Sequence, residues 1–256
     1  MTDLADAILG RNSDRSNQPA LICTGQELSF ITYATLGSWV KRNRVTFKAA
    51  GLSRASVCCL ALPNGPAFVA AFIAALDLIA VVAPLNPTIR SARKLCRAYD
   101  ISLCFNAGPE NFHKADIDLK RAANDEDCAL AECHCYPGDV DIQIVRPRNM
   151  TTNASAMAGL GSDSDFTALT LHTSGTAGRP KAAPLLQSNL QASINSVIES
   201  YELRSSGRSI LIMPLFHIHG IVAGLPAPLL TGSSVVIPEK GLGPDFWLDF
   251  EKHHAT

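Results

Sequence analysis

"SVCCLALPNGPAFVAAFIAALDLIAVVAPLN", Ser56–Asn86, is the stretch of sequence that decides the fold. A short apolar run stops at the turn residues "PNGP", a longer apolar run follows, and a second short one begins at Ala80. Strands that are apolar throughout are typical of parallel sheets buried on both faces. Asp77 and Pro84 interrupt the long run, so we interpret Ala67–Leu85 as a buried helix followed by a strand rather than a membrane span.

The segments on either side repeat this pattern. "ALICTGQELSFITYATL" (20–36) predicts two strands joined by a turn at Thr24, and the helix that follows ends at Gly51. "SARKLCRAYD" (91–100) predicts a helix and "ISLCFNA" (101–107) a strand. Repeated strand–helix–strand units predict an α/β fold of stacked, mostly parallel sheets with helices on both faces.

The composition excludes several classes of protein. The 256 residues are 47% hydrophobic and 18% charged, with a net charge of −1, as expected for a globular protein. Because no basic run occurs, we expect no nucleic-acid partner. The first residues, "MTDLADAILGRNSDRS", do not resemble a secretory signal, so the eight cysteines do not predict disulfides.

One cysteine cluster raises a separate hypothesis. "CALAECHCY" brings together Cys128, Cys133, His134 and Cys135, but no second pair follows at the spacing of a zinc site. We therefore expect no metal ligands in the protein and keep a Cys/His metal-binding module as a minor alternative.

Three regions are predicted along the chain: a first α/β subdomain (1–124), a polar linker region (125–165) and the start of a second α/β subdomain (166–256). The linker is inferred from fading periodicity and from the stretch "RPRNMTTNASAMAGLGSDSD". In the second subdomain Phe166–Thr173 alternates as a strand does. A helix is expected to begin near Ser188, with Ser188 and Gln191 as a capping box.

Between that strand and that helix lies the loop "TSGTAGRPK", Thr173–Lys181. Gly175 and Gly178 allow sharp turns and a close approach to a ligand, and the intervening backbone N–H groups can bind phosphate oxygens. Hydroxyl groups and the Lys181 cation add donors. The spacing is not that of a Walker A loop, because Pro180 precedes the lysine and Ala182 follows it.

The loop resembles the signature of adenylate-forming enzymes, the superfamily of acyl-CoA synthetases and adenylation domains. "HTSGTAGRPKAAPLLQSNL" is similar to its phosphate-loop motif, and "LSFITYATL", "LALPNGPAFVAAFIAALDLIAVVAPLNPTI" and "MPLFHIHG" are similar to three further motifs. The resemblance covers most of Leu21–Thr256. Within the superfamily, "MPLFHIHG" and "APLLTGSSVVIP" most resemble the oxalate–CoA ligase group, and the resemblance implies the N-terminal domain of such a ligase.

The resemblance implies a reaction and a set of site residues. An acid, possibly oxalate, would react with ATP and Mg²⁺ to give an acyl-adenylate, and CoA would then displace AMP. Lys181 and His217 are the expected catalytic residues, and His217, His219 and Gly220 are expected along the acid pocket. The positions that match the loop holding the β- and γ-phosphates are Thr173, Ser174, Gly175, Thr176, Gly178 and Lys181.

Departures from the motif leave two functional classes open. Ala177 replaces a threonine that would donate a hydrogen bond, and Ala182 replaces a glycine, which would strain the loop if φ were positive there. The sequence is expected to lack the family's adenine-binding segment and C-terminal lid domain. It is therefore either part of an acid–CoA ligase, inactive alone, or a non-catalytic remnant that binds nucleotide weakly or pairs with a partner.

The expected location is cytoplasmic or peroxisomal. No secretory signal is apparent, and the last three residues, "HAT", do not match a peroxisomal address.

Overall fold

A computed structural model describes residues 4–10, 14–24, 29–87, 101–107, 128–136, 138–147, 165–173, 181–239 and 241–256. The helices are α1 (Leu4–Leu9), α2 (Tyr33–Ala49), α3 (Pro66–Asp77), α6 (Gln187–Ser200), the π-helical turn η3 (Gly220–Gly224), α7 (Pro226–Thr231) and α8 (Phe246–Lys252). The strands are β1 (Pro19–Cys23), β2 (Ser29–Thr32), β3 (Val57–Ala61), β4 (Val81–Pro84), β5 (Ile101–Ala107), β6 (Ala129–Tyr136), β7 (Asp139–Arg146), β8 (Thr167–Thr173), β9 (Lys181–Leu186), β10 (Arg208–Ile210) and β11 (Ser234–Ile237).

The larger sheet has seven strands in the order β7-β6-β5-β3-β4-β8-β9. The five inner strands run parallel, whereas β7 and β9 pair antiparallel at the two edges. Every residue of β3 is buried, as expected for a strand at the centre of a parallel sheet. The strand–helix–strand unit predicted at 56–86 is confirmed as β3, α3 and β4.

The smaller sheet has four strands in the order β10-β11-β1-β2. β10, β11 and β1 are parallel, and β2 returns antiparallel to β1, which confirms the two strands predicted in 20–36. Two mostly parallel sheets connected through helices confirm the predicted α/β class. The helix expected at 91–100 lies outside the described residues.

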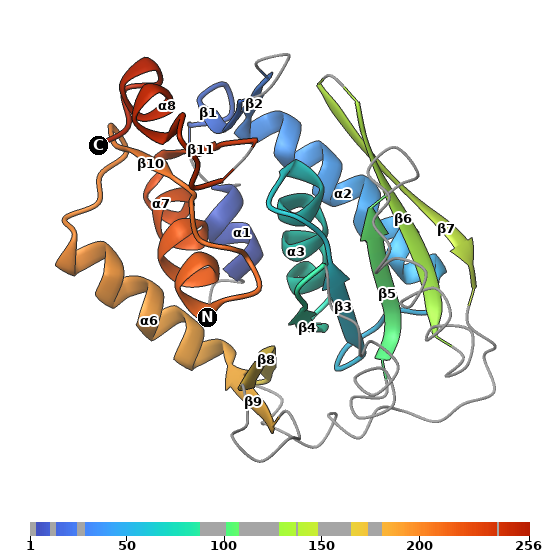
Figure 1. Cartoon of the computed structure of the whole chain (residues 1–256). Coiled ribbons are helices and arrows are strands. Elements are labelled where there is room, and N and C mark those ends of the chain that lie inside the picture. The colour runs from blue at the N-terminus through green and yellow to red at the C-terminus, as the bar shows by residue number, and fades with distance from the viewer. Residues whose placement is uncertain are drawn as a thin grey trace.

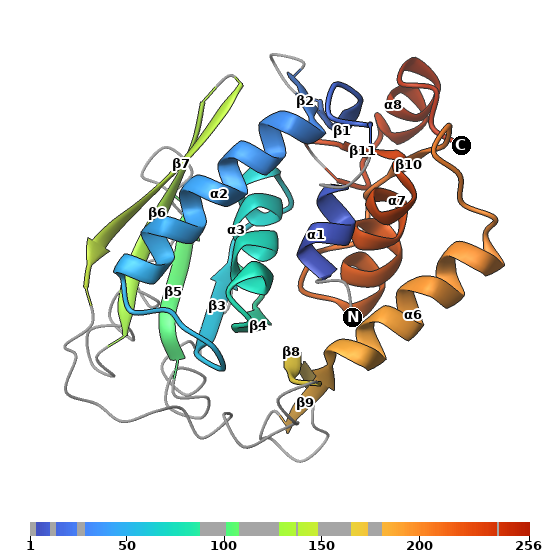
Figure 2. The ribbon, with the colours of Figure 1, turned by 180° about the vertical axis from the view of Figure 1, so that it is seen from behind.

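Helices join the two sheets (Figure 1). α3 packs against the seven-stranded sheet and α7 against β11, while α1 contacts both α3 and α7. The view from behind shows the same order, with α1 between α3 and α7 (Figure 2). No described helix is both long and apolar enough to cross a membrane.

Tyr33, from the "LSFITYATL" motif, ties the first helices to the smaller sheet. Its hydroxyl lies 2.9 Å from the carbonyl oxygen of Leu229 and 2.7 Å from that of Ser233, at the end of α7. Arg15 lies over the Tyr33 ring, with 4.7 Å between the guanidinium carbon and the ring centroid. The motif therefore places a buried hydroxyl between two backbone carbonyl groups at the C-terminal end of α7.

The predicted polar linker needs a correction in its first part. Residues 129–136 and 139–146 form β6 and β7, an antiparallel hairpin at the edge of the larger sheet. In β7 Val140 and Ile142 are buried and alternate with more exposed residues, which is the signal that the prediction missed. The remainder from 148 to 164 lies outside the described residues, and the division into subdomains stays a prediction.

The start of α6 also differs from the prediction. The helix begins at Gln187, and Ser188 makes no capping box with Gln191. Instead Asp165 accepts hydrogen bonds from the Ser188 backbone N–H (3.1 Å) and hydroxyl (2.6 Å), and Asn189 accepts one from the Leu186 N–H (3.1 Å). A carboxylate at a helix N-terminus is favoured by the helix dipole, so Asp165, distant in sequence, and Asn189 cap the helix in place of the predicted Ser188–Gln191 pair.

Candidate functional site

The two ends of the predicted phosphate loop are held together by a hairpin. β8 and β9 pair antiparallel along their length, and Thr173 is the register partner of Lys181. Lys181 is exposed at the start of β9. Ser174, Gly175, Thr176 and Gly178 lie outside the described residues, as does the side chain of Thr173.

The hairpin opens at the edge of the sheet where ligands bind in parallel α/β folds. β8 is parallel to β4, with Val82 opposite Leu169, and β4 is parallel to β3. The carboxyl ends of these strands therefore meet at one edge, which is where such folds bind ligands. The loop that follows Thr173 leaves the sheet at this edge, as does the turn that follows β3.

Ala182 does not cause the strain considered from the sequence. It lies in β9 opposite His172, and it is not among the described non-glycine residues with positive φ. Ala182 is therefore accommodated within the pairing of β8 and β9 without a positive φ.

His172 is a neighbour of the loop that sequence reasoning missed. It is half-buried on β8, one residue before Thr173. Burial lowers the pKa of His172 below its usual value, so its imidazole is neutral near pH 7. The signal was its place in the strand pattern, directly before the loop.

The "MPLFHIHG" motif forms a tight turn after β10. The His217 N–H donates to the Pro214 carbonyl oxygen at 3.0 Å, and the His217 carbonyl accepts from Ile221 N–H at 3.0 Å. A Cβ atom at Gly220 would lie 2.5 Å from the Pro214 carbonyl oxygen, so a side chain cannot fit there. The turn leaves both His217 and His219 exposed, while Gly220 is buried beneath them.

Asn64 connects this turn to the larger sheet. Its amide nitrogen donates to the Met213 carbonyl oxygen at 2.9 Å, and its amide oxygen accepts from the Leu215 N–H at 2.8 Å. Asn64 follows β3, whereas Met213 and Leu215 follow β10, so the two hydrogen bonds join loops from different sheets. Sequence reasoning quoted Asn64 within a motif but gave it no role.

A second connection runs through α6. This helix follows β9 directly, and it packs against η3, which begins at Gly220. Leu190 and Ile194 are the buried residues of its inner face. Helix α6 therefore connects β9, which begins at Lys181, with η3, which follows the histidine turn.

Of the three residues predicted along the acid pocket, His219 lines a cavity of about 420 Å³. The cavity lies between α6, β10 and η3, and its walls are mostly apolar. The apolar side chains that line it are Val197, Leu203, Ile210, Leu211, Ile212, Met213 and Ala223. His217 and Gly220 do not line this cavity.

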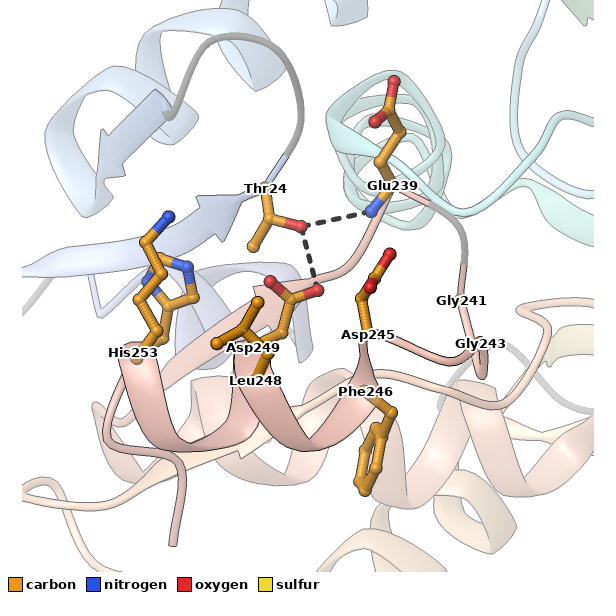
Figure 3. A pocket seen from close by; sticks show the side chains of 10 residues that line it. Thr24, Glu239, Gly241, Gly243, Asp245, Phe246, Leu248, Asp249 and His253 are labelled. Atoms are coloured by element: carbon orange, nitrogen blue, oxygen red, sulfur yellow. Dashed lines mark hydrogen bonds between the residues drawn. The ribbon is translucent and has the colours of Figure 1, made fainter.

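A different, more polar pocket of about 200 Å³ lies beside α8 (Figure 3). The Thr24 hydroxyl donates to an Asp249 carboxylate oxygen at 3.4 Å and accepts from the Glu239 N–H at 3.3 Å. None of the residues predicted for the site line this pocket. We therefore place the candidate site at the hairpin and the histidine turn.

The cysteine cluster lies on the edge hairpin. Along β6 Cys133 is buried, whereas Cys135, two residues further on and on the same face, is exposed because it lies near the end of the strand. Burial raises the pKa of the Cys133 thiol. Within the described part of the chain, no group of three or more His, Cys, Asp or Glu side chains is arranged to hold a metal ion.

Comparison with known proteins adds a family and several relatives. Residues 11–256 match the family described as AMP-binding enzyme. A probable CoA ligase of Humulus lupulus is 30% identical over 244 residues, which cover 94% of this chain and 45% of that protein. An oxalate–CoA ligase of Arabidopsis thaliana is 29% identical over 231 residues, covering 88% of this chain and 44% of that protein. The chain thus spans less than half the length of these relatives.

The fold is also similar to that of solved structures. The crystal structure of apo MatB from Rhodopseudomonas palustris superposes with a TM-score of 0.77 at 18% identity, over 98% of this chain and 47% of that one. The ATP-bound form of the same protein gives the same values. At this identity the likeness concerns the fold.

Proposed function

Because the chain belongs to the AMP-binding enzyme family, as its motifs predicted, we propose that it carries the phosphate-binding part of an AMP-forming acid–CoA ligase. In the proposed reaction a carboxylate oxygen attacks the α-phosphorus of ATP and pyrophosphate leaves. The CoA thiolate then attacks the acyl carbon of the adenylate, and AMP leaves. ATP, CoA and a small carboxylic acid are the proposed substrates.

The observation that supports this proposal most directly is the register of the hairpin. With Thr173 opposite Lys181, the glycine-rich segment between them is closed at its base and starts at the carboxyl edge of the parallel strands. Closed loops of backbone N–H groups with one cation stabilise the charge that develops on a departing phosphate group. The proposed phosphate-holding residues are Thr173, Ser174, Gly175, Thr176, Gly178 and Lys181.

We assign the remaining roles as follows. His217, exposed on its tight turn, is proposed to contact the acid and the α-phosphate during adenylation. Mg²⁺ is the proposed metal cofactor, and phosphate oxygens are ligands of the kind that it prefers. The metal would supply charge neutralisation while the residues of this chain bind and orient the phosphates.

For the acid, oxalate is the first candidate. Support comes from the likeness to the oxalate–CoA ligase of Arabidopsis thaliana, together with two exposed histidines that suit a dicarboxylate. The apolar walls of the cavity beside His219 favour a different acid, one with a hydrocarbon tail. A substrate panel must therefore contain both kinds.

The first experiment measures ATP binding by this chain with the variant Lys181→Ala. Removing a cation that contacts phosphate should weaken ATP binding at least about tenfold, since a hydrogen bond to a charged group contributes about 1.5–3 kcal/mol. Lys48→Ala is the matched control, because Lys48 is an exposed lysine in the last turn of α2. Equal affinities for the wild type and both variants would contradict the proposed phosphate site.

The second experiment separates catalysis from binding. Acid-dependent exchange between ATP and pyrophosphate is measured with oxalate, succinate, acetate and a medium-chain fatty acid. Exchange with one acid that His217→Ala abolishes supports the ligase and identifies the acid. Exchange would also exclude the second candidate, a non-catalytic nucleotide-binding protein, which the alanine at 177 favours because one hydroxyl donor is missing from the loop. ATP binding without exchange is expected both for that candidate and for a ligase part that is inactive alone.

A further inference from the structure

The turn that carries His217 has a polar anchor outside its own sheet. The Asn64 side chain forms two hydrogen bonds to this turn, as donor to the Met213 carbonyl (2.9 Å) and as acceptor from the Leu215 N–H (2.8 Å). These backbone groups lie four and two residues before His217. Together they fix the path of the chain just before the turn.

The anchor comes from the sheet that carries the phosphate hairpin. Asn64 follows β3, and β3 pairs with β4, which in turn pairs with β8. Met213 and Leu215 follow β10 of the smaller sheet. The two hydrogen bonds therefore connect the larger sheet, whose strand β8 ends at Thr173, with the segment of chain directly before His217.

We propose that Asn64 is a positioning residue that holds the His217 turn in register with the phosphate hairpin. The role of His217 in this proposal rests on the proposed function, whereas the contacts of Asn64 with the turn do not. Asn64 acts through the backbone of Met213 and Leu215, and it has no role in touching substrate.

The type of side chain explains why asparagine suits this position. A primary amide offers a donor and an acceptor on one rigid plane, and the two backbone groups that it meets are an acceptor and a donor. Reversing the amide would place the oxygen against the Met213 carbonyl and the nitrogen against the Leu215 N–H. Aspartate at neutral pH keeps only the acceptor, and alanine keeps neither.

The position of the anchored segment also determines the position of His217. Pro214, between the two anchored residues, accepts the His217 N–H at 3.0 Å, and its carbonyl oxygen fills the space at Gly220. The Leu215 side chain is 1% exposed and belongs to the hydrophobic core, so apolar packing also holds the turn in place. A shift of Met213–Leu215 therefore moves the backbone of His217.

The test uses the whole 256-residue chain and needs no ligand. Hydrogen exchange of the Leu215 amide and the imidazole resonances of His217 are measured by NMR in the wild type, Asn64→Ala and Asn64→Asp. We expect exchange at Leu215 to be about tenfold faster in Asn64→Ala, with a smaller increase in Asn64→Asp, because that variant keeps the acceptor. The His217 resonances should shift or broaden in the same order.

Asn195→Ala is the matched control, since it removes an exposed amide that accepts a hydrogen bond from Gln191 on α6. Its Leu215 exchange and His217 resonances should equal those of the wild type. If Asn64→Ala does not fold, the comparison of Asn64→Asp with the wild type tests the proposal. Unchanged Leu215 exchange and His217 resonances in the folded Asn64 variants, or equal changes in Asn195→Ala, would overturn the proposal.

ATP titration of the wild type tests the proposed function separately. An ATP-induced shift of His217 that is halved or lost in Asn64→Ala supports both the anchor and the function. Absence of ATP binding by the wild type, with the Leu215 and His217 changes still present, leaves the anchor standing and counts against the proposed function alone.

Discussion

Helices α3 and α8 are both rich in apolar residues, yet one is enclosed and the other lies at the surface. Ten consecutive residues of α3, Ala67–Leu76, are buried between α1, α2 and the seven-stranded sheet. In α8 no residue is buried, and Trp247 and Leu248 are 68% and 63% exposed. Apolar composition therefore leads to burial only where neighbouring elements supply an apolar surface.

The two helices are accordingly held by different forces. Burial of apolar area stabilises α3. At the end of α8 the Arg208 guanidinium donates to the His253 carbonyl at 2.6 Å, and the Thr256 N–H donates to the Arg208 carbonyl at 2.8 Å. Thr24 adds a hydrogen bond to Asp249. Polar contacts thus attach α8 to the edge of the smaller sheet.

The largest expected effect tests the enclosed helix. Phe72→Ala should lower the free energy of unfolding by about 3–5 kcal/mol, because the ring is fully buried and its removal leaves a cavity. Urea unfolding followed by circular dichroism measures the change. Val45→Ala, at a site on α2 that is 68% exposed, is the control and should change little. A loss below about 1 kcal/mol for Phe72→Ala would show that α3 is not the centre of the core.

A smaller effect is expected from the polar attachment of α8. Arg208→Ala removes the guanidinium bonds to His253 and to Ser234, the latter at 3.1 Å, and leaves the backbone contacts with Thr256 in place. A hydrogen bond from a charged donor contributes about 1.5–3 kcal/mol, and this change should appear in urea unfolding. Amide exchange in α8 should accelerate more than in α3. Equal acceleration in the two helices would contradict a local attachment.

The same comparison shows what the sequence could predict. The apolar pattern of 56–86 was sufficient to predict α3 and its two strands, because short runs that are apolar throughout are typical of strands buried on both faces of a sheet. The phosphate loop and the histidine turn were found by motif, and the register of Thr173 with Lys181 agrees with a loop closed at its base. The roles of their residues remain predictions.

The contacts between distant segments could not be predicted. Asn64 meets Met213 and Leu215 across about 150 residues, and Asp165 replaces the expected cap at Ser188. No local pattern records such pairs, because tertiary packing decides which polar side chain reaches which backbone group. The β6–β7 hairpin was missed because β6 contains Glu, His and Cys and is buried over its first five residues, so it shows no alternation of apolar and polar residues.

A pH dependence is expected from the end of α8. Burial lowers the pKa of His253 below its usual value, and the Lys252 cation lowers it further. The unfolded chain therefore binds a proton at higher pH than the folded chain, so this contribution to stability is complete above about pH 6.5 and is lost as the pH falls toward the folded pKa. Unfolding midpoints at pH 7.5 and 5.5 measure it. His253→Gln should reduce the difference, whereas His254→Asn, at the exposed neighbour, should reduce it less, because the His254 charge is the weakest of the influences on the pKa of His253.

The smallest expected effect concerns the exposed face of α8. Trp247→Ala should change the free energy of unfolding by no more than about 0.5 kcal/mol, because Trp247 is 68% exposed and its ring meets those of Phe246 and Phe250 edge-on. Urea unfolding of this variant beside Phe72→Ala compares the two helices directly. A loss above about 2 kcal/mol would mean that the indole is buried in solution. Helices α3 and α8 would then differ in what covers their apolar side chains, and not in whether these side chains are exposed.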